Sequence, residues 1–103
     1  MKEYNKLVRD DIPKIIEESG NTCDIKIVMG KEKEKYLEKK LNEEVNEYLE
    51  DKNLEELTDI MEVLFALADN LGYSEEELLN KRAEKKSQRG SFKKGIILKK
   101  VIE

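Results

Sequence analysis

Two long helical patterns, separated by a very short interruption, constrain the fold of this chain most strongly. Apolar residues recur at helical spacing over residues 31–51 and again over residues 53–70. Between the two stretches, Asn53-x-x-Glu56 has the pattern of a capping box, which starts a new helix. Because only a short turn joins the two helices, we expect them to pack side by side as antiparallel neighbours.

Two shorter helices are expected on either side of this pair. One covers about residues 12–19, with Pro13 in its first turn and a glycine directly after it. The other, over about residues 74–87, begins with a second capping box, Ser74-x-x-Glu77. Residues 24–29 alternate and are rich in β-branched side chains, and the apolar residues of 96–102 are their candidate partner. We therefore expect an all-α antiparallel helical bundle with at most a short two-stranded β element.

The composition fits one helical domain over residues 1–103. Charged residues make up 43 % of the chain and apolar residues 38 %, with a single proline, a balance that favours helices over sheet. The single cysteine, Cys23, excludes an intramolecular disulfide and indicates a reducing compartment. No apolar run approaches the ~20 residues of a membrane span, and the N-terminus has no signal-peptide pattern. We expect a cytoplasmic protein without a membrane partner.

The second long helix is too apolar to be covered by one thin bundle. Nine of the twelve residues in 60–71 are apolar, so more than one side of this helix must be buried. A chain of 103 residues buries only a modest core by itself. The sequence therefore predicts a homo-oligomer.

Four carboxylates lie in two i,i+3 pairs, one on each long helix. Leu37, Leu41, Glu44 and Tyr48 share one helical stripe, so Glu44 takes a position where an apolar residue is expected. A carboxylate in an apolar stripe is costly unless something compensates its charge. The facing pairs, Glu44 with Glu47 and Glu56 with Asp59, supply the oxygen ligands that Mg²⁺ prefers.

The chain contains no histidine, which excludes Ser-His-Asp and Cys-His nucleophilic sites and the usual zinc ligand sets. Oxygen ligands without imidazole favour Mg²⁺ or Mn²⁺. Three acids of this region also have a structural interpretation, whereas Glu44 and Asp59 have none that is as simple. Glu56 has the N3 position of its capping box, Glu47 lies at the edge of the stripe, and Glu43 suits an exposed salt bridge.

Positive charge is concentrated at the C-terminal end. Residues 1–80 contain 11 Lys/Arg and 22 Asp/Glu, whereas residues 81–103 contain 9 and 2. Lys85 and Arg89 lie on one ridge, and a loop with two glycines and Phe92 follows. Such a cluster suits phosphate groups, with Phe92 against a base, but a solvated cationic helix end has the same composition. The acidic remainder of the chain speaks against a nucleic-acid partner.

Three segments resemble one known family. Glu43-Glu44-x-x-Glu47 followed by Glu56-x-x-Asp59 is similar to the EExxE…ExxD signature of the MazG-like all-α nucleotide pyrophosphohydrolases. The opening YNKLVRDDIP (residues 4–13) resembles the YNKLVRDKIP start of a phosphoribosyl-ATP-pyrophosphohydrolase-like subgroup, with Asp11 where that start usually has lysine. The subgroup's closing KxxxRGxFxxGIxL pattern matches residues 85–98.

The resemblance implies a Mg²⁺-dependent hydrolase that assembles as a homodimer or homotetramer of helical bundles. It implies cleavage of a nucleoside triphosphate between the α and β phosphates. The resemblance does not fix the substrate, and we favour a non-standard or deoxy nucleotide. Phosphoribosyl-ATP in histidine biosynthesis and a non-catalytic interaction module of the same fold are the alternatives. The implied metal ligands are Glu44, Glu47, Glu56 and Asp59. We expect Glu43 or Glu47 to orient the attacking water. The expected substrate-binding residues are Lys6, Arg9, Lys85, Arg89 and Phe92.

Overall fold

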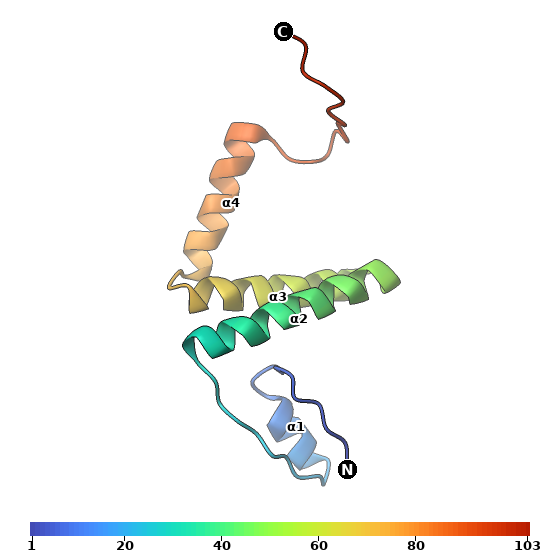
Figure 1. Cartoon of the computed structure of the whole chain (residues 1–103), viewed down its shortest axis with the longest axis vertical. Coiled ribbons are helices and arrows are strands. Elements are labelled where there is room, and N and C mark those ends of the chain that lie inside the picture. The colour runs from blue at the N-terminus through green and yellow to red at the C-terminus, as the bar shows by residue number, and fades with distance from the viewer.

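Four helices and no strand make up the fold, as Figure 1 shows in a computed structural model that describes all 103 residues. In chain order these are α1 (Ile12–Glu18), α2 (Gly30–Asp51), α3 (Leu54–Asn70) and α4 (Glu75–Arg89). The expectation of an all-α fold is confirmed. The expected helix bounds agree with the structure to within about two residues.

The starts of α3 and α4 have side-chain caps that the sequence predicts, whereas α1 and α2 begin without one. Ser74 accepts a hydrogen bond from the backbone N–H of Glu77, and the Glu77 carboxylate accepts one from the N–H of Ser74, so this capping box is complete. At α3 only half of the box forms. The Asn53 side chain accepts from the N–H of Glu56 at 3.0 Å, but the Glu56 carboxylate does not return to Asn53. The Glu56 side chain therefore stays available for other contacts.

Helices α2 and α3 form an antiparallel hairpin, and they pack against each other along much of their length (Figure 1). Only Lys52 and Asn53 join them, and Lys52 has the left-handed conformation that reverses the chain, with φ 48° and ψ 53°. At the opposite end, the Asn70 amide donates to the Gly30 carbonyl at 3.1 Å and ties the end of α3 to the start of α2.

The core of the single chain is small. Only four residues are buried, namely Leu37, Val63, Ala68 and Glu44. Helix α4 leaves the hairpin at a steep angle and carries the C-terminal segment away from it, while α1 lies on the other side (Figure 1). The radius of gyration is 18.1 Å, against about 13 Å for a compact domain of this length. One chain therefore does not close into a complete bundle.

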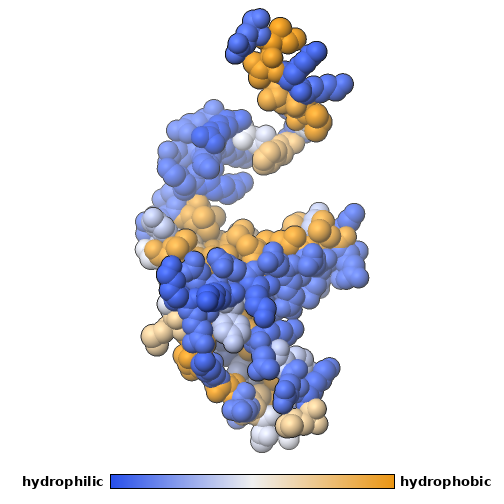
Figure 2. Space-filling view, in the orientation of Figure 1, coloured by the Kyte–Doolittle hydropathy of each residue, from blue (hydrophilic) through white to orange (hydrophobic).

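Several large apolar side chains of α3 stay largely exposed in the single chain. Leu54, Leu57, Met61 and Leu64 are between 43 % and 78 % exposed, and they follow one another at spacings of three and four residues. Figure 2 shows this apolar band along the hairpin and a second apolar region on the C-terminal segment. None of the four helices has both the length and the apolar character needed to span a membrane.

The short two-stranded β element is wrong for the single chain. Residues 24–29 and 96–102 contain no strand, and no backbone hydrogen bond joins them. A strand requires a neighbouring backbone to satisfy its N–H and C=O groups. The two segments lie at opposite ends of a molecule 64 Å long (Figure 1), so neither can serve as the other's partner within one chain.

Candidate metal centre

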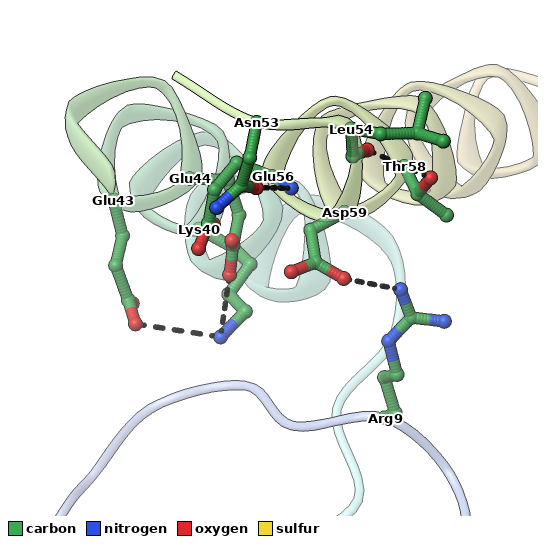
Figure 3. A network of polar contacts seen from close by, with 9 residues as sticks. All are labelled: Arg9, Lys40, Glu43, Glu44, Asn53, Leu54, Glu56, Thr58 and Asp59. Atoms are coloured by element: carbon green, nitrogen blue, oxygen red, sulfur yellow. Dashed lines mark hydrogen bonds and ion pairs between the residues drawn. The ribbon is translucent and has the colours of Figure 1, made fainter. Parts of the chain in front are cut away.

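The hairpin brings the four predicted acids together. One carboxylate oxygen from each of Glu44, Glu47, Glu56 and Asp59 lies within 4.8 Å of the corresponding atoms of the other three. Each pair projects from one helical face because its members are three residues apart. The tight turn at Lys52 and Asn53 then places the end of α2 opposite the start of α3. Figure 3 shows Glu44, Glu56 and Asp59 directed into the same space.

Glu44 is the only buried charged residue in the chain. It is 6 % exposed, and its Oε2 atom is shielded from water without a hydrogen-bond donor. Glu56 Oε2 is likewise shielded and has no donor. Buried polar atoms almost always have a partner, so these two oxygens are exceptions that a hydrogen-bond donor, a proton or a cation would satisfy.

Burial and the crowding of negative charges shift the pKa of two acids in this cluster. Burial raises the pKa of the Glu44 carboxyl, and the neighbouring Glu47 adds to this effect, whereas Lys40 opposes it. The pKa of Glu56 is also raised, by the shielding of its carboxylate first and then by the negative charges of Asp51 and Asp59. Both shifts favour the neutral form of the acid, as expected for carboxylates that crowd one another.

Lys40 is a site residue that the sequence analysis missed. Its Nζ atom lies 3.3 Å from Glu44 Oε1 and 3.5 Å from Glu43 Oε1, and its side chain is only 18 % exposed (Figure 3). The available signal was the i,i+4 spacing of Lys40 and Glu44. That spacing is common in a helix this rich in Lys and Glu, so it did not single out Lys40 from its neighbours.

Glu43 forms ion pairs at the edge of the cluster. Lys6 Nζ donates to Glu43 Oε1 at 3.1 Å, and Lys40 contacts the same oxygen. Partial burial raises the pKa of Glu43, but Lys6 and Lys40 outweigh this effect, so the net pKa is lowered. The hydrogen bond to Glu43 raises the pKa of Lys6 in turn. The structural interpretation of Glu43, a partly exposed salt bridge, thus describes the contacts that this residue makes.

Arg9 reaches the opposite side of the cluster. Its Nη2 atom donates to Asp59 Oδ1 at 2.8 Å, across 50 residues of sequence (Figure 3). The N-terminal segment therefore contacts both helices of the hairpin, with Lys6 paired to Glu43 on α2 and Arg9 paired to Asp59 on α3. Both residues were predicted as substrate ligands, and the structure places both beside the carboxylates.

A cavity adjoins the cluster on the side of Lys6. It has a volume of about 240 Å³ and lies between the N-terminal segment and α2. Its lining residues are Asn5, Lys6, Leu7, Tyr36, Lys39, Lys40 and Glu43. Three ammonium groups and a single carboxylate line this space, so its charge is opposite to that of the neighbouring acid cluster. No motif or spacing in the sequence singled out Tyr36, Lys39 or Asn5.

The structure does not bring the other predicted substrate ligands to this site within one chain. Lys85 and Arg89 lie on α4, which points away from the hairpin, and Phe92 follows on the C-terminal segment (Figure 1). All three are exposed, Phe92 completely so. Asp11, which replaces the lysine usual in the resembling subgroup, is exposed at the start of α1 and makes no side-chain hydrogen bond.

The raised pKa of Glu44 predicts how stability depends on pH. The folded chain holds the proton of Glu44 more tightly than the unfolded chain, in which the pKa has its ordinary value of 4.5. The free energy of unfolding should therefore fall relative to that of Glu44→Gln as pH rises from below 4.5 through the folded-state pKa. Urea unfolding of both proteins without divalent cations, between pH 4 and pH 8, measures this difference. A constant difference across that range would contradict the prediction.

Comparisons of this chain with protein-family models, curated proteins and solved structures gave no match.

Proposed function

We propose that this protein is a Mg²⁺-dependent nucleotide pyrophosphohydrolase. It would cleave a non-standard or deoxy nucleoside triphosphate between the α and β phosphates, giving a monophosphate and pyrophosphate. The observation that carries the proposal is the cluster of four carboxylates with two shielded oxygens that lack a donor. The sequence resemblance to the MazG-like enzymes supports the same activity.

The residues present fit a divalent cation. Glu44, Glu47, Glu56 and Asp59 offer only oxygen atoms, which is the donor set of Mg²⁺ and Mn²⁺. The shielded atoms Glu44 Oε2 and Glu56 Oε2 would gain the positive partner that the chain does not supply. When bound, a divalent cation neutralises phosphate oxygens and lowers the pKa of a coordinated water.

The cavity beside the cluster supports the binding of a polyphosphate. Lys6, Lys39 and Lys40 line it, and ammonium groups stabilise phosphate oxygens by charge-assisted hydrogen bonds. Lys6 and Lys40 also contact Glu43, so the cavity and the acid cluster share their boundary. A nucleotide with its polyphosphate in this cavity would have its phosphates within reach of the carboxylates.

The chain's own residues account for the remaining steps. Hydrolysis joins a water oxygen to the α-phosphorus and breaks the bond from this phosphorus to the bridging oxygen. Pyrophosphate leaves with that oxygen, and the water releases a proton to the solvent. Glu47, or less directly Glu43, would orient that water by accepting its hydrogen bond. Lys6 and Arg9 would stabilise the negative charge that develops on the phosphates. To do so, Arg9 would exchange part of its contact with Asp59 for a phosphate oxygen.

The proposed active site includes residues from a second copy of the chain. Lys85, Arg89 and Phe92 act on the substrate only if another chain carries them to the hairpin, since α4 directs them away from their own site. The exposed apolar band of α3 also requires a partner. We therefore propose a homodimer or homotetramer as the active form.

A screen of nucleotides tests the proposed function. The purified chain is incubated with canonical, deoxy and non-standard nucleoside triphosphates and with phosphoribosyl-ATP, with and without Mg²⁺, and released pyrophosphate is measured. We expect Mg²⁺-dependent release from a non-standard or deoxy nucleotide. Release from phosphoribosyl-ATP alone would assign the histidine pathway step instead. Release from none of them would favour a non-catalytic interaction module.

A further inference from the structure

Two extended segments of this chain have strand-like sequences but no partner. No backbone hydrogen bond within the chain involves residues 24–28 or residues 96–102. Ile25, Ile27 and Met29 alternate along the first segment and are 59 %, 78 % and 76 % exposed. The large apolar side chains of the second segment are 75–84 % exposed, and these are Ile96, Ile97, Leu98, Val101 and Ile102. Unpaired backbone beside exposed apolar side chains is the condition in which a segment adds to another strand.

The turn between α3 and α4 directs the C-terminal part of the chain away from residues 24–29. The N–H of Tyr73 donates to the Ala68 carbonyl at 2.9 Å and that of Gly72 to the Asp69 carbonyl at 2.9 Å, which together form a Schellman motif. The complete capping box at Ser74 follows directly. These hydrogen bonds fix the direction of α4, and the C-terminal segment that follows it lies at the end of the molecule opposite to residues 24–29 (Figure 1).

The exposed area indicates how extensive the missing contacts are. The chain exposes 9666 Å², whereas a compact monomer of 12.1 kDa exposes about 6,000 Å². The excess of about 3,600 Å² is several times the ~800 Å² per partner of a standard interface. An area of this size is typical of chains that fold around each other as obligate oligomers.

Charge favours a second copy of the same chain as the partner. The C-terminal part from residue 81 holds 9 Lys/Arg and 2 Asp/Glu, and the rest of the chain holds 11 and 22. Each copy thus has a basic C-terminal arm (residues 81–103) with exposed apolar side chains, and an acidic body (residues 1–80). In a two-fold dimer the arm of each copy meets the body of the other, so both surfaces are satisfied at once.

We infer that residues 96–102 of one copy pair as a β-strand with residues 24–28 of a second copy, and reciprocally, to form two small intermolecular sheets. The inference rests on the oligomer included in the proposed function but not on its chemistry. A test that measures backbone protection therefore separates the two, because it needs neither metal nor nucleotide. A protein that fails to hydrolyse nucleotides can still pass this test, and an active enzyme can fail it.

Amide hydrogen exchange on the full chain measures the pairing. In the wild-type protein the amides of 25–28 and 97–101 should exchange at least about 10-fold more slowly than in Ile27→Pro or Leu98→Pro, because proline removes an N–H from the ladder. Each variant alone should lose protection in both segments. Glu3→Pro, in an exposed extended segment outside the proposed pair, is the matched control and should keep full protection.

Mixing the two variants identifies the partner. Ile27→Pro and Leu98→Pro are combined in denaturant and refolded together, so that a mixed dimer keeps one of its two strand pairs. Random association should restore protection of the wild-type segments in about half of the chains. Isotope-filtered NMR contacts between labelled and unlabelled wild-type copies give the same answer without a variant. If the two segments of the wild-type protein show no protection, the inference is overturned. If the wild-type protein shows protection but the mixed variants do not regain it, the inference is also overturned, and the two segments pair within one chain.

Discussion

Substitution of Asp59 by Asn is expected to lower the rate of nucleotide hydrolysis by about 100-fold. The substitution removes one negative ligand from the carboxylate cluster and releases Arg9 from its contact at 2.8 Å. A cation held by the protein contributes several kcal/mol of transition-state stabilisation, and a loss of about 3 kcal/mol corresponds to about two orders of magnitude in rate. Pyrophosphate release from the best nucleotide of the screen, at saturating Mg²⁺, measures the effect.

Asp69→Asn is the matched control for this experiment. Asp69 lies on the same helix, is exposed, and is outside the cluster, so its substitution makes the same chemical change away from the site. The control should retain the wild-type rate. If Asp59→Asn were as active as Asp69→Asn while keeping its helical circular dichroism, the acid cluster would not be the centre of the reaction.

Addition of Mg²⁺ is expected to raise the melting temperature of the wild-type protein by about 10 °C or more. A ligand present at about 100 times its Kd stabilises the folded state by about 2.7 kcal/mol, and about 1 kcal/mol shifts the melting temperature of a domain this size by roughly 4 °C. Glu44→Gln should abolish the shift, because an amide at this position removes the most buried of the four carboxylates proposed to bind the cation. Without Mg²⁺ the same variant should be the more stable protein, since it no longer buries a poorly compensated charge.

Glu38→Gln on the exposed side of α2 controls for the general loss of an acidic residue. It should keep the full response to Mg²⁺. Thermal unfolding is followed at one fixed protein concentration, because the melting temperature of an oligomer depends on concentration. A wild-type protein that shows no response to Mg²⁺ or Mn²⁺, or a Glu44→Gln variant that keeps the wild-type response, would contradict the metal assignment.

Local rules account for most of the secondary structure. Asn53 and Ser74 both cap their helices as the sequence predicts, and Gly72 follows α3 in the left-handed conformation expected at a helix end. These features involve residues at most a few positions apart, so the sequence contains nearly all the information that determines them. The clustering of Glu44 with Asp59 also follows from local facts, namely two helical faces and a two-residue turn.

Contacts between distant segments were less predictable. Lys6 and Arg9 were predicted as substrate ligands only through the resemblance to the MazG-like enzymes. Nothing in the spacing of Arg9 and Asp59 indicated an ion pair across 50 residues. Lys40 was missed because many Lys–Glu pairs in α2 have equivalent spacing, and only its burial beside Glu44 distinguishes it. Lys39 and Tyr36 emerge as cavity residues only when the N-terminal segment crosses α2.

The sequence by itself determined four helices, the caps of α3 and α4 and an acid pair on each helix of the hairpin, because backbone hydrogen bonding and side-chain periodicity act over a few residues. The tertiary structure alone decided that residues 24–29 find no strand partner in their own chain, and that Lys85 and Arg89 lie far from the acids. The hydrogen-bonded turn at Gly72 fixes the direction of α4, and a helix that points away carries every later residue with it. The direction of α4 depends on this junction. The sequence of the residues that follow α4 would suit a position near the hairpin as well as one far from it.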